Sequence, residues 1–144
     1  MKISKPFKSV LVVTIISCLL FCSTLMVISL SPLSDMGKHA NQFNSVGMWL
    51  SVGIIFVSYL IPLVIYSLGV EWIKYLMAIF CFLGLLISIG ITVFIVAVDH
   101  FEKDIFSDPT LIASVICVGL LFMTNLIWFF VTFLPSSKDI KLEN

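Results

Sequence analysis

The sequence predicts an all-α membrane protein: an antiparallel bundle of four transmembrane helices with both termini in the cytoplasm. All sixteen charged side chains lie outside four stretches, residues 9–34, 39–70, 75–98 and 109–137. Each stretch supplies the roughly 20 apolar residues that a helix needs to cross the hydrocarbon core of a bilayer. The uneven distribution of lysines between the connections predicts the orientation.

The four predicted spans have ordinary start and stop signals. They cover approximately residues 10–30, 48–68, 75–98 and 111–134. Pro32 ends the first span, because proline cannot donate a backbone hydrogen bond and moves its predecessor out of helical geometry. Asp108 and Pro109 are predicted to be the N-cap and the first helical residue of the fourth span. A six-residue turn from Gly69 to Lys74 makes the second and third spans antiparallel neighbours.

Lysines mark the predicted cytoplasmic side. Six lie on the side of the two termini and the turn between spans two and three: Lys2, Lys5, Lys8, Lys74, Lys138 and Lys141. Only Lys38 and Lys103 lie opposite, so the positive-inside bias places both termini in the cytoplasm. The net charge of zero gives no reason to expect a nucleic-acid partner. The connections are short, so residues 1–144 are expected to form a single integral membrane domain.

The N-terminus has a second interpretation, because three lysines before an apolar run also describe a signal peptide. Residues 15–18 loosely match a bacterial lipoprotein cleavage box ending at Cys18. The apolar core of a signal peptide is typically about 7 to 15 residues long, whereas here the apolar run continues to Leu30. We therefore expect this segment to be kept as the first span.

Asn125 is the most polar side chain within any predicted span. Three polar residues on other spans lie at roughly the same depth in the membrane: Ser17 on the first span, and Ser58 and Tyr59 on the second. Asn125 can therefore form an interhelical hydrogen bond. The interpretation we favour is structural, with Asn125 holding helices together. The alternative makes Asn125 part of an ion or solute path.

Two further features concern helix shape and packing. Pro62 falls near the middle of the second span and leaves the carbonyl of Ser58 without its helical hydrogen bond, which predicts a kink. The favoured interpretation is that the bundle accommodates this kink without a function, and the alternative is that it acts as a hinge. On the third span Cys81, Gly84, Ser88 and Thr92 form a stripe of small side chains where another helix can approach closely. A partner helix of the same chain is favoured over a second copy. The aromatic run Trp128, Phe129, Phe130 and Phe133 is expected to anchor the inner end of the fourth span.

Cysteines and histidines give little reason to expect a metal ion or a cofactor. Cys18, Cys22, Cys81 and Cys117 all fall inside predicted spans, where thiols behave as small hydrophobic groups. Outside the spans, His39 and the sequence Asp99-His100-x-Glu102 offer ligands for a weak cation site, although a solvated loop is the favoured interpretation. No metal or cofactor is predicted.

Several functional classes are disfavoured by the sequence. It contains no phosphate-binding loop, nucleophile elbow or zinc motif, so no enzyme activity is predicted. Small proton-coupled multidrug exporters have a similar size and four spans, but they depend on an acidic residue within the membrane. The four spans here contain none, which argues against proton coupling by that route.

The first outer loop carries a family resemblance. Ser31-Pro-Leu-Ser-Asp, followed by Ala40-Asn-Gln-Phe-Asn-Ser-Val-Gly-Met-Trp49, lies between apolar spans and resembles small four-span membrane proteins of Bacillus-type bacteria. The resemblance implies a multi-pass protein of a bacterial cytoplasmic membrane. That group has no assigned activity, so the resemblance implies no functional residue.

These observations predict a non-enzymatic accessory or interaction protein, with envelope stress and toxin immunity as candidate settings. Its expected partners are the lipid bilayer and either another membrane protein or a second copy of the chain. The alternative is a small transporter or channel that assembles as an oligomer around Tyr59, Pro62 and Asn125.

Overall fold

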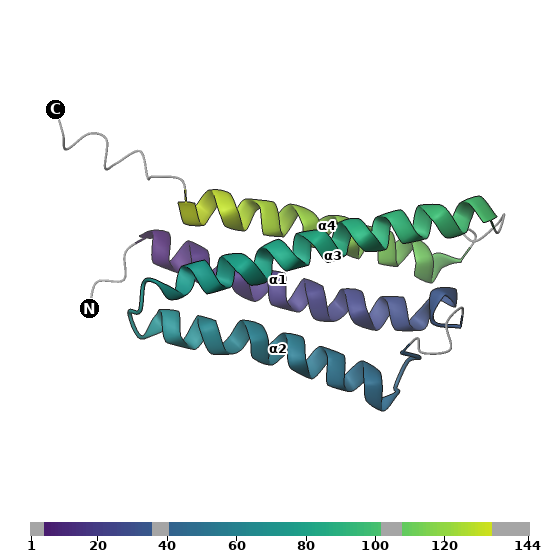
Figure 1. The fold of residues 1–144 in the computed structure, drawn as a ribbon, viewed down its shortest axis with the longest axis horizontal. Helices are drawn as coiled ribbons and strands as arrows, with labels where there is room; N and C mark the ends of the chain where they lie inside the picture. The colour runs from purple at the N-terminus through teal and green to yellow at the C-terminus, as the bar shows by residue number, and fades with distance from the viewer. Residues whose placement is uncertain (1–4, 36–40, 102–107, 134–144) are drawn as a thin grey trace.

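The computed structural model describes residues 5–35, 41–101 and 108–133. This part of the chain folds into four long helices and one short 3-10 turn (Figure 1). They are α1 (Lys5–Leu30), η1 (Pro32–Ser34), α2 (Val46–Ser67), α3 (Ile73–Phe101) and α4 (Pro109–Phe133). All four long helices have the length and hydropathy required to cross a membrane. The predicted all-helical, four-span architecture is confirmed.

The helices pack as an up-and-down bundle in which each helix lies beside its neighbours in the sequence. α2 packs on α1 and α3, α4 packs on α3, and the pair formed by α1 and α4 closes the ring with the most extensive contact. The start of α1, the end of α4 and the α2–α3 connection lie at the same end of the bundle (Figure 1). Short connections between successive helices favour this arrangement.

Local hydrogen bonds explain where α2 and α4 begin. The Ser45 hydroxyl oxygen accepts a 3.1 Å bond from the Met48 amide, an N-cap that starts α2 two residues before the predicted span. The Asp108 carboxylate accepts bonds from the backbone amide and the hydroxyl of Thr110, at 2.8 and 2.6 Å. The predicted N-cap of the fourth helix is therefore confirmed, with Pro109 in the first helical position.

The ends of α3 differ from expectation. Gly69 adopts the left-handed conformation, with φ of 93°, which lets the chain turn directly after α2. At the other end, Asp99 and His100 belong to the last turn of α3. The predicted third span ended at residue 98, and α3 instead continues to Phe101. Residues 102–107 lie outside the described residues.

Buried side chains follow a coiled-coil spacing on the two most closely packed helices. On α1 they include Val10, Thr14, Ser17, Phe21 and Thr24. On α4 they are Leu111, Ser114, Val118, Leu121, Asn125 and Trp128. Successive members are three or four residues apart, which keeps one narrow face of each helix against the other. Many of these residues are small or polar, as is typical of helix contacts in membranes.

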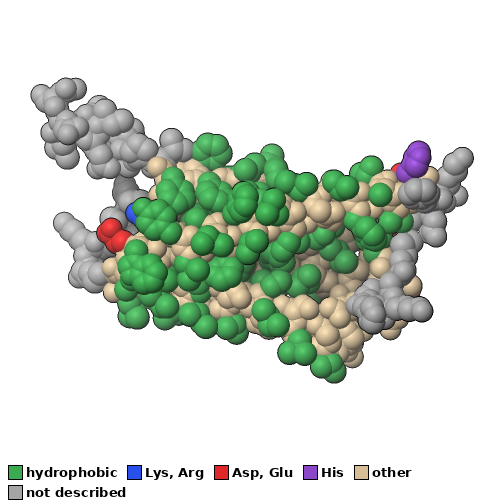
Figure 2. Space-filling model, in the orientation of Figure 1, with side chains coloured by type: hydrophobic (Ala, Val, Ile, Leu, Met, Phe, Trp, Pro, Cys, Tyr) green, Lys and Arg blue, Asp and Glu red, His purple; other side chains and the backbone are tan. Residues whose placement is uncertain are grey.

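The outside of the bundle is apolar along its whole length. Hydrophobic side chains cover the face seen in Figure 2, and charged side chains and a histidine lie at its ends. Large exposed side chains occur on every helix, including Leu19, Ile54, Val93 and Met123. Such a surface is suited to hydrocarbon, and the membrane-spanning helices therefore contact the lipid bilayer.

Candidate functional site

One residue from each helix meets near the middle of the bundle. We call Ser17 of α1, Tyr59 of α2, Gly84 of α3 and Asn125 of α4 the central polar cluster. Asn125 has no exposed surface, and the Ser17 hydroxyl donates a 2.6 Å hydrogen bond to its Oδ1. The interhelical bond expected for Asn125 is therefore present, and Ser17 is its partner.

Gly84 makes room for the Asn125 amide. A Cβ atom at position 84 would lie 2.7 Å from Asn125 Nδ2, a separation that a carbon atom cannot adopt without displacing the amide. The same Cβ would be 3.5 Å from the Tyr59 hydroxyl and from the ring of Phe21. A glycine on α3 thus allows side chains from the other three helices to converge on its backbone.

The cluster contains two polar groups without hydrogen-bond partners. They are the Tyr59 hydroxyl and Asn125 Nδ2, and both are buried. An unpaired polar group away from water costs about 1 to 3 kcal/mol. Chemically, the cluster can donate hydrogen bonds to a neutral oxygen. Its side chains are a hydroxyl, a phenol and an amide, and it contains no carboxylate or imidazole for acid–base chemistry at neutral pH.

A second polar contact joins α1 and α4 one turn away. The Trp128 Nε1 donates a 2.7 Å hydrogen bond to the Thr14 hydroxyl, which itself donates to the Val10 carbonyl, also at 2.7 Å. Trp128 has no exposed surface. The sequence placed it in an interfacial aromatic anchor, which is wrong, because its ring points into the bundle and packs edge-on against Phe129.

The sequence offered a signal for this missed contact. Thr14 precedes Ser17 by three residues, and Trp128 follows Asn125 by three. In two antiparallel helices, moving three residues back along one helix and three residues forward along the other leads to the same level. If Ser17 contacts Asn125, Thr14 is therefore expected to contact Trp128. That spacing was overlooked because Trp128 is followed by two further aromatic residues, and such a run favours an aromatic anchor at the end of the helix.

Other small polar residues form hydrogen bonds to the backbone of their own helices. The hydroxyls of Thr124 and Ser88 donate to the carbonyls of Leu120 and Gly84, both at 2.8 Å. Ser88 is buried on the bundle side of α3, whereas Thr92 is exposed. The small-residue stripe of α3 therefore packs within the chain at Gly84, and its outer end faces outward.

Pro62 is buried and α2 remains helical through it. The space beside Pro62 is too small to admit a water molecule. It is lined by Thr14, Ser58, Tyr59, Met77, Phe80 and Cys81 in addition to Pro62. In this structure Pro62 is a packed residue of α2, and the hinge interpretation remains a prediction.

The four cysteines are free thiols, and Cys18 and Cys81 are buried. Within the described residues, no group of three histidine, cysteine or acidic side chains is placed to hold a metal ion. Two of the residues considered for an outer cation site, His39 and Glu102, lie outside the described residues.

Comparison with known proteins places the chain in a family. A model described as a family of unknown function, DUF5391, matches residues 1–137. The chain is also 42% identical to the uncharacterized protein YxaJ of Bacillus subtilis (strain 168) over 135 residues, which cover 94% of each chain. No solved structure matches it. The resemblance to proteins of Bacillus-type bacteria is thus confirmed, and the chain belongs to the DUF5391 family, as a small multi-pass protein of the bacterial cytoplasmic membrane.

Proposed function

We propose that this protein is a non-enzymatic interaction protein, which binds another membrane protein through its lipid-facing surface. The observation that supports this most strongly is the filled middle of the bundle. There Ser17 and Asn125 are hydrogen-bonded, Gly84 is covered by the Asn125 amide, and the space beside Pro62 has no room for water. Among the described residues, this packing leaves no room for water beside Pro62 at the middle of the bundle, as expected for a chain that does not conduct a solute.

Charge supports the same proposal. The predicted spans, residues 10–30, 48–68, 75–98 and 111–134, contain no acidic or basic side chain. Intramembrane ionisable residues are the usual marks of ion pathways and proton relays. The charged side chains lie instead at the ends of the helices and in the connections between them, where they are available to a partner that packs on the apolar surface.

We further propose that both termini are cytoplasmic. The six-to-two distribution of lysines supports this orientation. A fluorescent protein that folds only in the cytoplasm, fused after Asn144, is expected to be bright, and an alkaline phosphatase fused there is expected to be inactive. The opposite pair of results would reverse the topology.

A flux assay tests the proposed function. The purified chain, reconstituted in liposomes, is expected to carry K⁺, protons and small neutral solutes no faster than empty liposomes do. In cells, a photo-crosslinker placed at exposed positions of each helix, such as Ile54, Val93 and Met123, is expected to give one adduct of defined mass from one face. The buried position Val118 serves as the control. Protein-dependent flux would contradict the proposal.

A second candidate function rests on the two unpaired donors of the central polar cluster. Tyr59 and Asn125 could bind a neutral, oxygen-bearing solute in an oligomeric transporter. This candidate predicts flux in the parent protein and its loss in Asn125→Leu at unchanged expression. The same liposome assay therefore separates the two functions.

A further inference from the structure

A crevice runs between α1 and α2 on the lipid-facing side of the bundle, with a volume of about 230 Å³. We call it the α1–α2 crevice. It is lined by Thr14, Ile15, Cys18 and Leu19 of α1 and by Phe56, Tyr59, Leu60 and Leu63 of α2. We propose that it binds one acyl chain of an anionic phospholipid whose phosphate lies beside Lys8.

The lining of the crevice fits a hydrocarbon chain. Most of its side chains are aliphatic or aromatic, and the Thr14 hydroxyl is already hydrogen-bonded to Trp128 and Val10 inside the bundle. Leu19 and Leu60 are both exposed, so the crevice is continuous with the surface that contacts lipid. A helix is about 10 Å across and is too wide for this space, whereas an alkyl chain is narrow and flexible.

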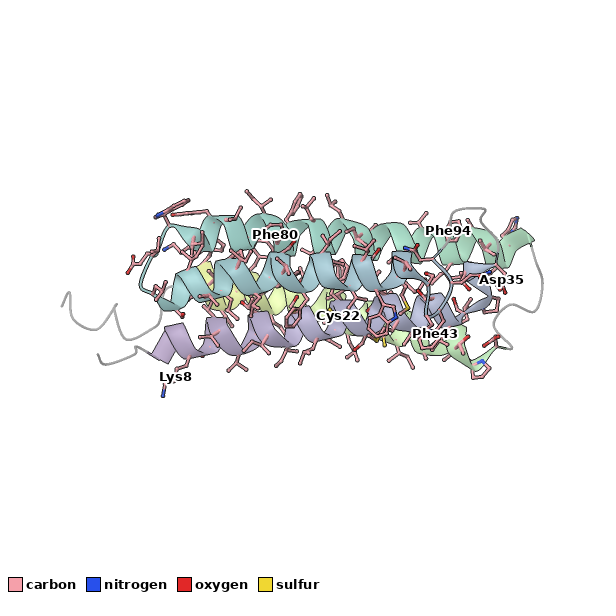
Figure 3. All side chains as sticks on the ribbon, turned by 90° about the horizontal axis from the view of Figure 1, so that it is seen from below. Lys8, Cys22, Asp35, Phe43, Phe80 and Phe94 are labelled. Carbon is pink, nitrogen blue, oxygen red and sulfur yellow. The ribbon has the colours of Figure 1, made fainter. Side chains whose placement is uncertain are left out.

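Lys8 supplies the complementary charge for the headgroup. It lies seven residues before Ile15, so two helical turns bring it to the same face of α1 as the crevice. Its side chain is exposed at the end of the bundle and points away from the other helices (Figure 3). A lysine at this level attracts the phosphate of an anionic lipid.

The distance from Lys8 to the far end of the crevice agrees with the thickness of one leaflet of the bilayer. Leu19 follows Lys8 by eleven positions, which corresponds to about 16 Å at a rise of 1.5 Å per residue. Half of a hydrocarbon core about 30 Å thick is nearly the same length. A phospholipid with its phosphate at Lys8 therefore places one chain along the crevice. Because Tyr59 belongs to both the crevice and the central polar cluster, that chain would also contact the cluster's outer wall.

Native mass spectrometry of the full chain tests the proposal. After delipidation the protein is titrated with dioleoyl phosphatidylglycerol and, separately, with dioleoyl phosphatidylcholine. We expect one phosphatidylglycerol to bind first and saturably. Leu60→Trp fills the crevice and is expected to lower its affinity at least about tenfold. Ile61→Trp adds the same ring at a more exposed position that does not line the crevice, and is expected to leave the affinity unchanged.

The headgroup contact has its own pair of variants. Lys8→Gln is expected to lower the affinity for phosphatidylglycerol about fivefold and to leave phosphatidylcholine unaffected. Lys74→Gln removes a lysine from the same end of the bundle, away from the crevice. It is expected to change the affinity for neither lipid.

Three results would overturn the proposal. In the first, several lipids bind with equal affinity and no first site is resolved. In the second, Leu60→Trp and Ile61→Trp behave alike, which would make the contact a general one of the bilayer. In the third, the protein is a dimer that Leu60→Trp dissociates, which would make a second copy the occupant.

Discussion

The Ser17 hydroxyl on α1 donates a 2.6 Å hydrogen bond to Asn125 Oδ1 on α4, across 108 positions of sequence. With the bond between Trp128 and Thr14, it fixes the register of the two helices that pack most extensively. Hydrogen bonds between membrane helices average about 0.6 kcal/mol. Their main effect here is to select one antiparallel alignment among several apolar ones.

A double-mutant cycle measures this bond. Asn125→Leu is expected to insert normally and to lose on the order of 1 kcal/mol of unfolding free energy, with a coupling to Ser17→Ala of about 0.6 kcal/mol. The loss is small because the Ser17 hydroxyl can turn to a carbonyl of its own helix. Unfolding in mixed micelles provides the measurement, and a coupling near zero would show that the bond contributes nothing.

The Gly84 contact predicts a steric effect. Gly84→Ala places a Cβ 2.7 Å from Asn125 Nδ2 and is expected to cost about 1 to 3 kcal/mol through overpacking. In an Asn125→Ala background the cost should fall, because the shorter side chain relieves the clash.

Gly90 and Gly119 are matched controls for that experiment. Neither has an atom within 4 Å of the Cβ that alanine would add. Alanine at either position should be neutral, or stabilising by up to about 1 kcal/mol through helix propensity. Equal destabilisation at all three glycines would refute the steric explanation.

Much of the fold could be predicted because a bilayer imposes simple rules. Four charge-free runs gave the four helices, and Asp108 with Pro109 marked the start of α4 correctly. The depth of Asn125 limited its candidate partners to Ser17, Ser58 and Tyr59, because the ends of antiparallel spans fix their relative heights, and the structure shows that Ser17 is the partner. The contact of Gly84 with Asn125 could not be predicted, since it depends on how each helix is rotated about its own axis. Apolar residues on every side of these helices leave that rotation undetermined.

Asp108 makes the stability of the α4 terminus depend on pH. Hydrogen bonds from the Thr110 hydroxyl and from backbone amides lower the pKa of its carboxyl group below the ordinary value. Its stabilising effect is therefore fully present above the unfolded pKa of about 3.9 and is lost as the pH falls through the lower folded value.

The variant Asp108→Asn keeps an oxygen acceptor and removes the titration. Above about pH 5 the parent should be more stable than the variant, and the difference should shrink below about pH 4. Thermal unfolding of both proteins from pH 7 to pH 3 provides the comparison. A difference that does not change with pH would mean that the charge of Asp108 is irrelevant to the cap.

The four free thiols are expected to be dispensable. Replacing Cys18, Cys22, Cys81 and Cys117 together by alanine should leave the amount of folded protein in the membrane nearly unchanged, because each acts as a small apolar side chain. Quantitative immunoblotting and size-exclusion chromatography provide the measurement. A metal ion bound by the parent and lost from the variant, at equal expression, would assign the thiols a role.

Water access to position 125 tests the closed bundle most directly. The measurement is the rate at which a charged, membrane-impermeant thiol reagent modifies Asn125→Cys in the cysteine-free protein, reconstituted with both faces available. Asp35→Cys and Leu68→Cys serve as positive controls, because both positions are exposed and they lie in the connections that precede and follow α2. Labelling of both controls without labelling of position 125 is the predicted result. Rapid modification at position 125 in the folded protein would contradict the filled core and favour a transport pathway.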